Sequence, residues 1–240
     1  MAREPNPALA VPFHGWLHPE LAEVGDGLTS LAGYLESTLG AVPNEEDLKP
    51  HERAALEWFE NLPRYANGLA LSVPLIHPDL CDLLIEEIKN PDNEWRPNEN
   101  EGRAYQIPEI VLRREIPTLH RSLHQFANQT LFKIMFLLWG KVPKHVESIQ
   151  LAWYSADGTR STEWHHDTDS NMTAVINLAP ELFTGGGTDV RTGIRTYDYI
   201  PPVPKGHALL FNGHQSLHRG APVESGDRYI LVYWTNDWEG

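Results

Sequence analysis

The second half of the sequence is built from short runs of strand-forming residues, and this pattern limits the fold more than any other feature. The runs are rich in β-branched and aromatic side chains and cover residues 149–154, 172–178, 207–211 and 229–234. Turn-forming pairs and triplets separate them: Asp157-Gly158, Gly185-Gly186-Gly187, Pro201-Pro202 and Ser225-Gly226. Many short strands at this spacing predict a sandwich or a jelly-roll barrel.

The first half instead shows the three- and four-residue spacing of apolar side chains that is typical of helices. The predicted helices cover residues 19–39, 50–61 and 117–139, with a further one from Pro78. Pro117 suits the first position of its helix, and Gly140 is placed to end it. Three glycines, Gly25, Gly27 and Gly33, weaken the prediction of the first helix.

The composition disfavours some classes of function. The 240 residues are 41% hydrophobic and 22% charged, as in ordinary globular proteins, and the net charge is −14. An acidic surface repels phosphate backbones, which makes a nucleic-acid partner unlikely to bind. No run approaches the roughly 20 apolar residues of a membrane span, and the N-terminus lacks the apolar core of a signal peptide. We therefore expect no contact with a membrane. Cys81 is the only cysteine, so no internal disulfide can form, and we expect a cytoplasmic protein.

The segment Trp164-His165-His166-Asp167 and the more distant His218 together offer ligands for one metal ion. The segment is predicted as a strand, in which residues two apart project to the same side, so His165 and Asp167 can share an ion. His218 lies in another strand-rich segment and supplies a third ligand. Two imidazoles and one carboxylate are the donor set of mononuclear non-haem iron sites. Arg228 follows as a fixed cation, suited to hold a carboxylate in bidentate fashion.

Some neighbouring residues are alternatives to these ligands. Asp169 shares the face of Asp167, but it lies farther from the first histidine of the segment. The rivals of the last histidine are His207 and His214. The triplet of glycines at 185–187 could suggest a phosphate cradle. No strand-to-helix context follows it, so we interpret it as a turn that lets the backbone approach another group closely.

Three further residues are candidates for a substrate pocket. His166 points to the opposite face from His165 and is expected to form part of the wall. Trp164 can stack on a substrate. Trp95 is the one large aromatic residue of a polar stretch, 91–102, which we interpret either as a lid that closes with Trp95 near the metal or as a solvated connection.

An ordered set of residues in the second half resembles a known family. The set is Tyr154, His165-x-Asp167, the stretch 173–178, Gly185-Gly186-Gly187, Pro204-x-Gly206-x-Ala208-Leu-Leu-Phe211, His218-x-Gly220 and Gly226-x-Arg228-Tyr229. It is similar to the catalytic domain of Fe(II)/2-oxoglutarate-dependent oxygenases, in particular the prolyl and lysyl hydroxylase branch. The likeness covers about residues 145–236 well and the helix at 117–139 more loosely.

The resemblance implies an α+β fold, in which a double-stranded β-helix (a jelly-roll, cupin-like core) carries N-terminal and supporting helices. Residues 1–68 would then form an N-terminal helical extension. Residues 69–240 would form the oxygenase domain, with the β-helix core at about 145–236.

The resemblance also implies an activity. Members of the family use 2-oxoglutarate and O2 as cosubstrates to hydroxylate a C–H bond, and they release succinate and CO2; ascorbate is a candidate reductant. The implied site residues are His165, Asp167 and His218 as Fe(II) ligands, Arg228 for the distal carboxylate of 2-oxoglutarate, and Tyr154 and Asn177 as polar groups that face it. The substrate would be a peptidyl residue of the proline type or a small molecule, and the oligomeric state stays open.

Three other functions are compatible with parts of this pattern. A non-redox, cupin-type metal-binding protein would use the three ligands but would not need Arg228. A nucleic-acid dealkylase of the same superfamily usually carries a second arginine on the last strand, where this chain has only Arg228. A zinc hydrolase would need a general base close by, and Glu163 is the near candidate.

Overall fold

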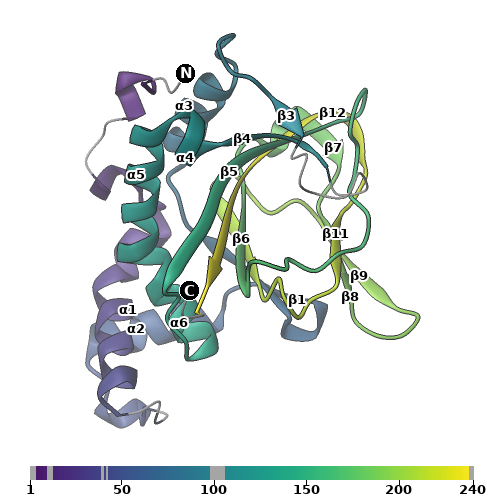
Figure 1. Cartoon of the computed structure of the whole chain (residues 1–240). Helices are drawn as coiled ribbons and strands as arrows, with labels where there is room; N and C mark the ends of the chain where they lie inside the picture. The colour runs from purple at the N-terminus through teal and green to yellow at the C-terminus, as the bar shows by residue number, and fades with distance from the viewer. Residues whose placement is uncertain (1–3, 10–12, 39–40, 42, 98–105, 238–240) are drawn as a thin grey trace.

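The computed structural model describes residues 4–9, 13–38, 41, 43–97 and 106–237 (Figure 1). Within these residues the strands form two antiparallel sheets. The larger sheet has the order β1-β2-β10-β6-β12-β5-β4-β3, with β7 paired to the first residues of β12, and the smaller sheet has the order β11-β8-β9. The strands are β1 Arg64–Tyr65, β2 Ala70–Pro74, β3 Arg96–Pro97, β4 Pro108–Val111, β5 His145–Ser155, β6 Met172–Asn177, β7 Phe183–Gly185, β8 Thr188–Arg191, β9 Tyr197–Ile200, β10 His207–Phe211, β11 His218–Gly220 and β12 Val223–Asn236.

Helices cover one face of the larger sheet (Figure 1). They are α1 Pro19–Ser37, α2 Pro50–Glu60, α3 Pro78–Ile88, α4 Leu112–Glu115, α5 Pro117–Phe126, the π-helical turn η5 Ala127–Leu131 and α6 Phe132–Trp139. Short 3₁₀ turns are η1 Pro7–Leu9, η2 Phe13–Trp16, η3 Glu45–Asp47, η4 Ala66–Gly68 and η6 Pro180–Leu182. None of the helices in the described part of the chain is both long and apolar enough to span a membrane.

The predicted helices are confirmed, and proline and glycine explain where they begin and end. Each of α1, α2, α3 and α5 has a proline at its start, where the missing N–H is not needed. The helix predicted over 117–139 runs through α5, η5 and α6 and contains one π-helical turn. Gly140 ends it with a φ of 67°, a left-handed conformation that glycine adopts without strain.

The larger sheet has two faces with different roles, and β12 shows the division. Leu231 and Tyr233 belong to the main hydrophobic core beneath the helices. Arg228, Ile230 and Val232 point to the other face, where they line a cavity. Because side chains alternate along a strand, a single strand supplies both the core and the cavity wall.

The N-terminal helices belong to the same core as the sheet. Leu21 and Leu28 of α1 lie in one buried cluster with Leu151 of β5 and Leu231 of β12. The segment before residue 69 therefore packs on the rest of the chain, and the domain boundary at 68/69 stays a prediction.

The first half of the chain is not wholly helical, which corrects the sequence interpretation. β2 pairs along its full length with β10, and β4 pairs with β5. All five residues of β2 are buried, so this strand lacks the polar alternation that would have revealed it. The stretch 91–102 is also more ordered at one point than expected, because Arg96 and Pro97 pair with β4. Its residues 98–102 lie outside the described part of the chain.

Gly27 and Gly33 both lie in α1 but have different surroundings. A Cβ at Gly27 would overlap the backbone of His51 and the Cβ of Ala55 in α2, whereas one at Gly33 would meet nothing within 4 Å. We expect Gly27→Ala to lower the free energy of unfolding by roughly 1–3 kcal/mol through overpacking. Gly33→Ala should raise it by roughly 0.5–1 kcal/mol, since alanine is the better helix former. Urea titration measures both, and an unchanged Gly27→Ala would contradict the close contact of α1 with α2.

Candidate metal centre

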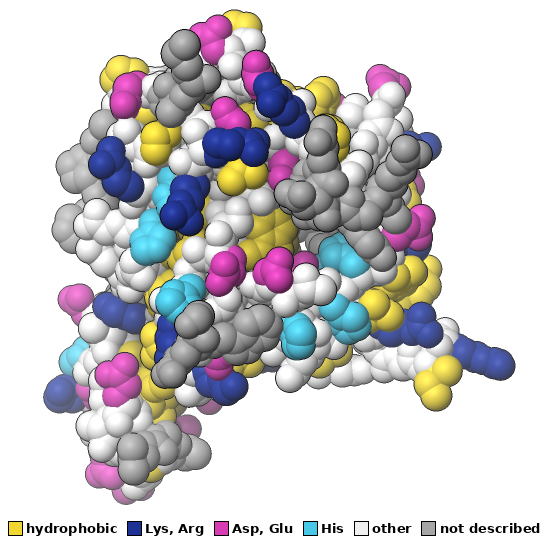
Figure 2. Space-filling view, viewed as in Figure 1, with side chains coloured by type: hydrophobic (Ala, Val, Ile, Leu, Met, Phe, Trp, Pro, Cys, Tyr) yellow, Lys and Arg dark blue, Asp and Glu magenta, His cyan; other side chains and the backbone are white. Residues whose placement is uncertain are grey.

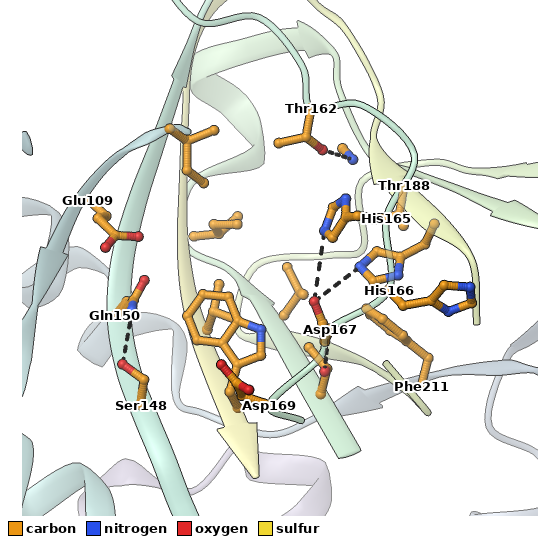
Figure 3. Close-up of a pocket in the computed structure, with 18 of the residues that line it drawn as sticks. Glu109, Ser148, Gln150, Thr162, His165, His166, Asp167, Asp169, Thr188 and Phe211 are labelled. Atoms are coloured by element: carbon orange, nitrogen blue, oxygen red, sulfur yellow. Dashed lines mark hydrogen bonds and ion pairs between the residues drawn. The ribbon is translucent and has the colours of Figure 1, made fainter. Parts of the chain in front are cut away.

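The two sheets enclose a cavity of about 840 Å³ (Figure 3). Its lining includes the proposed ligands His165, Asp167 and His218 together with Tyr154 and Arg228. Residues that are far apart in the sequence therefore meet in one cavity.

His165 and His218 are held side by side by their backbones. The N–H of His165 donates to the carbonyl of His218 at 2.8 Å, and the N–H of His218 donates back at 2.9 Å. Residues opposite each other in such an antiparallel bridge place their side chains on the same face, and the two rings lie 4.4 Å apart. The segment 164–167 was predicted as a strand, but it forms only this single bridge and no strand. The bridge, not a regular strand, brings the first histidine to the last.

Asp167 completes the group, and its two carboxylate oxygens have different partners. Its backbone N–H donates to the carbonyl of Gly213 at 3.0 Å, which anchors the residue. Oδ1 lies 3.8 Å from Nε2 of His165 and 3.7 Å from Nε2 of His218. Oδ2 accepts a hydrogen bond from the hydroxyl of Thr173 at 2.5 Å. One oxygen therefore faces both histidines, and the other is held away from them (Figure 3).

Hydrogen bonds to backbone carbonyls set the tautomers of both histidines. Nδ1 of His165 lies 2.8 Å from the carbonyl of Glu163, and Nδ1 of His218 lies 2.8 Å from the carbonyl of Ser216. A carbonyl can only accept, so each Nδ1 carries the hydrogen and each Nε2 keeps a lone pair that faces Asp167. Burial lowers the pKa of His218, against the opposing effect of Asp167, which favours the neutral imidazole. Two oriented imidazole nitrogens and one carboxylate oxygen can hold Fe(II).

Gly213 leaves the space that this carboxylate occupies. A Cβ at this position would overlap Oδ2 of Asp167 and the hydroxyl of Thr173, and would lie 2.8 Å from the Cβ of Asp167. We expect Gly213→Ala to weaken Fe(II) binding by roughly 10–100-fold, the usual cost of disturbing a group that orients a ligand. Gly158→Ala is the control, since its Cβ would meet only Ser155 at 3.7 Å. Iron titration of both variants measures the effect, and equal affinities would show that Asp167 tolerates displacement.

Arg228 is a buried cation that has no carboxylate partner among the described residues. Its side chain is 5% exposed, Nη1 donates to the carbonyl of Gly187 at 2.8 Å, and the guanidinium lies 5.2 Å from the ring centroid of Tyr154. Nε has no hydrogen-bond partner, and among the described residues no carboxylate forms an ion pair with this arginine. Burial lowers the pKa of Arg228, but a guanidinium stays protonated in proteins. A buried unpaired charge is costly, so the site fits a ligand that brings a carboxylate.

The glycine triplet, predicted as a turn, ends β7 at Gly185 and connects it to β8 through Gly186 and Gly187. The φ angles of Gly185, Gly186 and Gly187 are 72°, 68° and 87°, a region that favours glycine. A Cβ at Gly186 would lie 3.2 Å from Cδ of Arg228, so the turn passes directly beside the arginine side chain. The close backbone approach is thereby confirmed.

Other predicted residues also lie at the cavity. Tyr154, Trp164 and His166 are among its lining, and so is the rival carboxylate Asp169. Tyr154 packs so tightly that a Cβ at Gly220 would lie 2.8 Å from its hydroxyl. The guanidinium of Arg219 covers the ring of Trp164 at 4.8 Å, which places this tryptophan at the rim.

Two predicted residues lie elsewhere. Asn177 is not among the described residues that line the cavity; its amide donates to the carbonyl of Val203 at 2.7 Å. Trp95 packs against Trp153 and Tyr229, with ring centroids 5.7 and 6.2 Å away. Both partners alternate with cavity-facing residues and therefore point to the opposite face of the sheet. This corrects the expected position of Trp95 near the metal.

The rivals of His218 and the proposed hydrolytic base are separate from the centre. His207 contacts Ser72 and stacks edge-on with His18, and neither His207 nor His214 is among the described lining residues. Glu163 is also absent from the described lining. The sequence interpretation missed Thr173 and Gly213. Thr173 stood in the family-like stretch 173–178, but nothing in the sequence tied it to Asp167.

No family model matches the sequence. The 2-oxoglutarate and iron-dependent oxygenase domain-containing protein 2 of Xenopus tropicalis is 24% identical over 172 residues, which cover 68% of this chain and 47% of that protein. The chain thus spans about half the length of this curated relative.

Several solved structures are similar. A prolyl hydroxylase from Trichoplax adhaerens, solved with a peptide fragment of hypoxia-inducible factor, has a TM-score of 0.56 at 14% identity and covers 81% of this chain and 96% of its own. The carbocyclase SnoK of nogalamycin biosynthesis has a TM-score of 0.53 at 15% identity, covering 82% and 87%. A prolyl 4-hydroxylase of Phytophthora capsici has a TM-score of 0.54 at 17% identity, covering 70% and 59%.

The fold is therefore that of the double-stranded β-helix oxygenases, with helices packed on one face of a large antiparallel sheet, and the predicted fold class is confirmed. The resemblance to Fe(II)/2-oxoglutarate oxygenases, prolyl hydroxylases among them, is confirmed at the level of the fold.

Proposed function

We propose that this protein is an Fe(II)- and 2-oxoglutarate-dependent dioxygenase that hydroxylates a C–H bond of a peptidyl residue or a small molecule. The observation that carries the proposal is the content of one cavity: three converging ligand atoms and a buried arginine that forms no ion pair with any described carboxylate. A metal-binding protein without a cosubstrate would not need that arginine.

In this proposal His165, Asp167 and His218 hold Fe(II), and O2 is the second cosubstrate. When bound, iron and 2-oxoglutarate supply oxidative decarboxylation coupled to hydroxylation, with release of succinate and CO2. Arg228 binds the distal carboxylate, and the ring of Tyr154 packs beside the guanidinium.

Apolar side chains that line the cavity also support binding of 2-oxoglutarate. Val175, Ile230 and Val232 line the cavity and are partly or fully buried. They exclude water from the space between the arginine and the ligands, which strengthens the pairing of Arg228 with a carboxylate.

The substrate class is proposed from charge and from the relatives. The net charge of −14 disfavours nucleic acid. The Trichoplax adhaerens enzyme was solved with a peptide, and SnoK belongs to nogalamycin biosynthesis, so a peptide and a small molecule both fit this fold. We further propose that residues 1–68 support the oxygenase domain at 69–240.

Anaerobic addition of 2-oxoglutarate to the Fe(II) protein tests the activity. We expect a visible charge-transfer band, since 2-oxoglutarate would bind the iron through its keto oxygen and one carboxylate oxygen. Asp167→Ala should lack the band. A wild-type protein that holds one Fe(II) but shows no band would overturn the proposal and favour a cupin-type binding protein.

A further inference from the structure

The cavity is long, and β12 defines its length. Arg228 pairs with Tyr154 of β5, and Trp234 pairs with Ser148, with Ile230 and Val232 between them on the same face. The six residue-to-residue steps from Arg228 to Trp234 span roughly 20 Å in an extended strand. Thr173, the partner of Asp167, is also paired with Trp234. The metal ligands therefore lie toward the Trp234 end, away from the arginine.

The Trp234 end of the cavity is acidic. Glu147 and Asp169 line it, and Figure 2 shows acidic and histidine side chains along one side of a hollow. Arg228 is the only lysine or arginine among the described lining residues, and it lies at the other end. If 2-oxoglutarate neutralises Arg228 and iron neutralises Asp167, the substrate has to balance the negative charge of Glu147 and Asp169.

A break in the register between β5 and β12 turns the carboxylate of Glu147 toward the cavity. Trp234 pairs with Ser148, but the next residue of β12, Thr235, pairs with Val146, so Glu147 is the extra residue of a β-bulge. A bulge re-aims side chains, and here it lets the consecutive residues Glu147 and Ser148 both line the cavity. Oε1 of Glu147 also accepts a hydrogen bond from Asn236, which holds the carboxylate in place.

A buried acceptor at the same end lacks a donor. Gln150 is 7% exposed, and its Nε2 donates to Ser148 at 3.0 Å, but its Oε1 has no hydrogen-bond partner. Gln150 lies with Ser148 and Glu109 across the cavity from His165 and Asp167 (Figure 3). A buried oxygen without a partner is costly unless a ligand supplies an N–H or O–H donor.

We propose that this end of the cavity binds a cationic group of the substrate, an ammonium or guanidinium, and so presents a neighbouring C–H bond to the metal. Glu147 and Asp169 supply the charge, Oε1 of Gln150 accepts an N–H, and the face of Trp234 packs on the cation. The inference rests on the proposed function, because it concerns the substrate of the same site.

The test compares probes that differ only in charge. The probes are peptides of one length with lysine, arginine, norleucine, citrulline or glutamate at a single position, together with the same free amino acids. The readout is succinate release above the rate without a probe. We expect lysine or arginine probes to stimulate at least about 10-fold more than their neutral counterparts, the size of a charge-assisted hydrogen bond. In Glu147→Gln/Asp169→Asn this preference should fall to within about 2-fold.

Asp157→Asn/Glu57→Gln is the matched control, since it removes two exposed carboxylates outside the described lining and should keep the preference. The charge-transfer band separates the two proposals. Its absence in the wild type would overturn both. With the band present, a cationic probe that stimulates no better than a neutral one, or a preference that survives in Glu147→Gln/Asp169→Asn, would overturn this inference and leave the oxygenase proposal standing.

Discussion

His218→Ala is expected to abolish tight Fe(II) binding and to lower substrate turnover by more than about 100-fold. Loss of a group that merely orients a ligand costs roughly 10–100-fold, and loss of a ligand should cost more. The fold should survive, because the imidazole of His218 lies in the cavity and the main core is built from other side chains. Bound iron, succinate release and melting temperature measure the three effects.

His166→Ala is the control for this variant. His166 lines the cavity, but it is exposed and is not part of the converging ligand group. It should keep bound iron. If His166→Ala lost the metal while His218→Ala retained it, the ligand set proposed here would be wrong.

Arg228→Lys is expected to weaken 2-oxoglutarate binding by roughly 10–150-fold, which corresponds to the 1.5–3 kcal/mol of a charge-assisted hydrogen bond. Lysine keeps the charge but cannot reproduce the planar fork that binds a carboxylate through two parallel bonds. It also cannot hold the position that Arg228 takes between the carbonyl of Gly187 and the ring of Tyr154. Fe(II) affinity should change little, because no metal ligand contacts the guanidinium.

Isothermal titration of Fe(II) and of 2-oxoglutarate separates these outcomes. Arg219→Lys is a matched control, since Arg219 is a partly exposed arginine that pairs with Asp189 and does not line the cavity. Equal losses of both ligands in Arg228→Lys would indicate a folding defect and would contradict the assigned role.

Local patterns in the sequence determined much of the framework. Helix starts and ends could be predicted because proline and glycine act through their own backbone geometry, as Pro117 and Gly140 do. The strand at 207–211 could be predicted because β-forming residues and turn signals delimit it. The sequence also predicted that His165, Asp167 and His218 lie close together. The reason given was wrong, because the segment 164–167 does not form a strand.

Only the tertiary structure decided which side of the sheet a residue occupies and which distant residues it meets. Trp95 lies in a polar stretch of the sequence, which favours exposure to solvent. It nevertheless packs on the helix-covered face of the sheet, because β3 pairs with β4 there. Asn177 was expected to face the cosubstrate, but its side-chain amide donates to the carbonyl of Val203 in the loop between β9 and β10. The hydrogen bond from Thr173, the space left by Gly213 and the bulge at Glu147 all depend on register between strands. Register is set by the packing of whole sheets, and a shift of one residue reverses every side chain, so a local pattern cannot specify it.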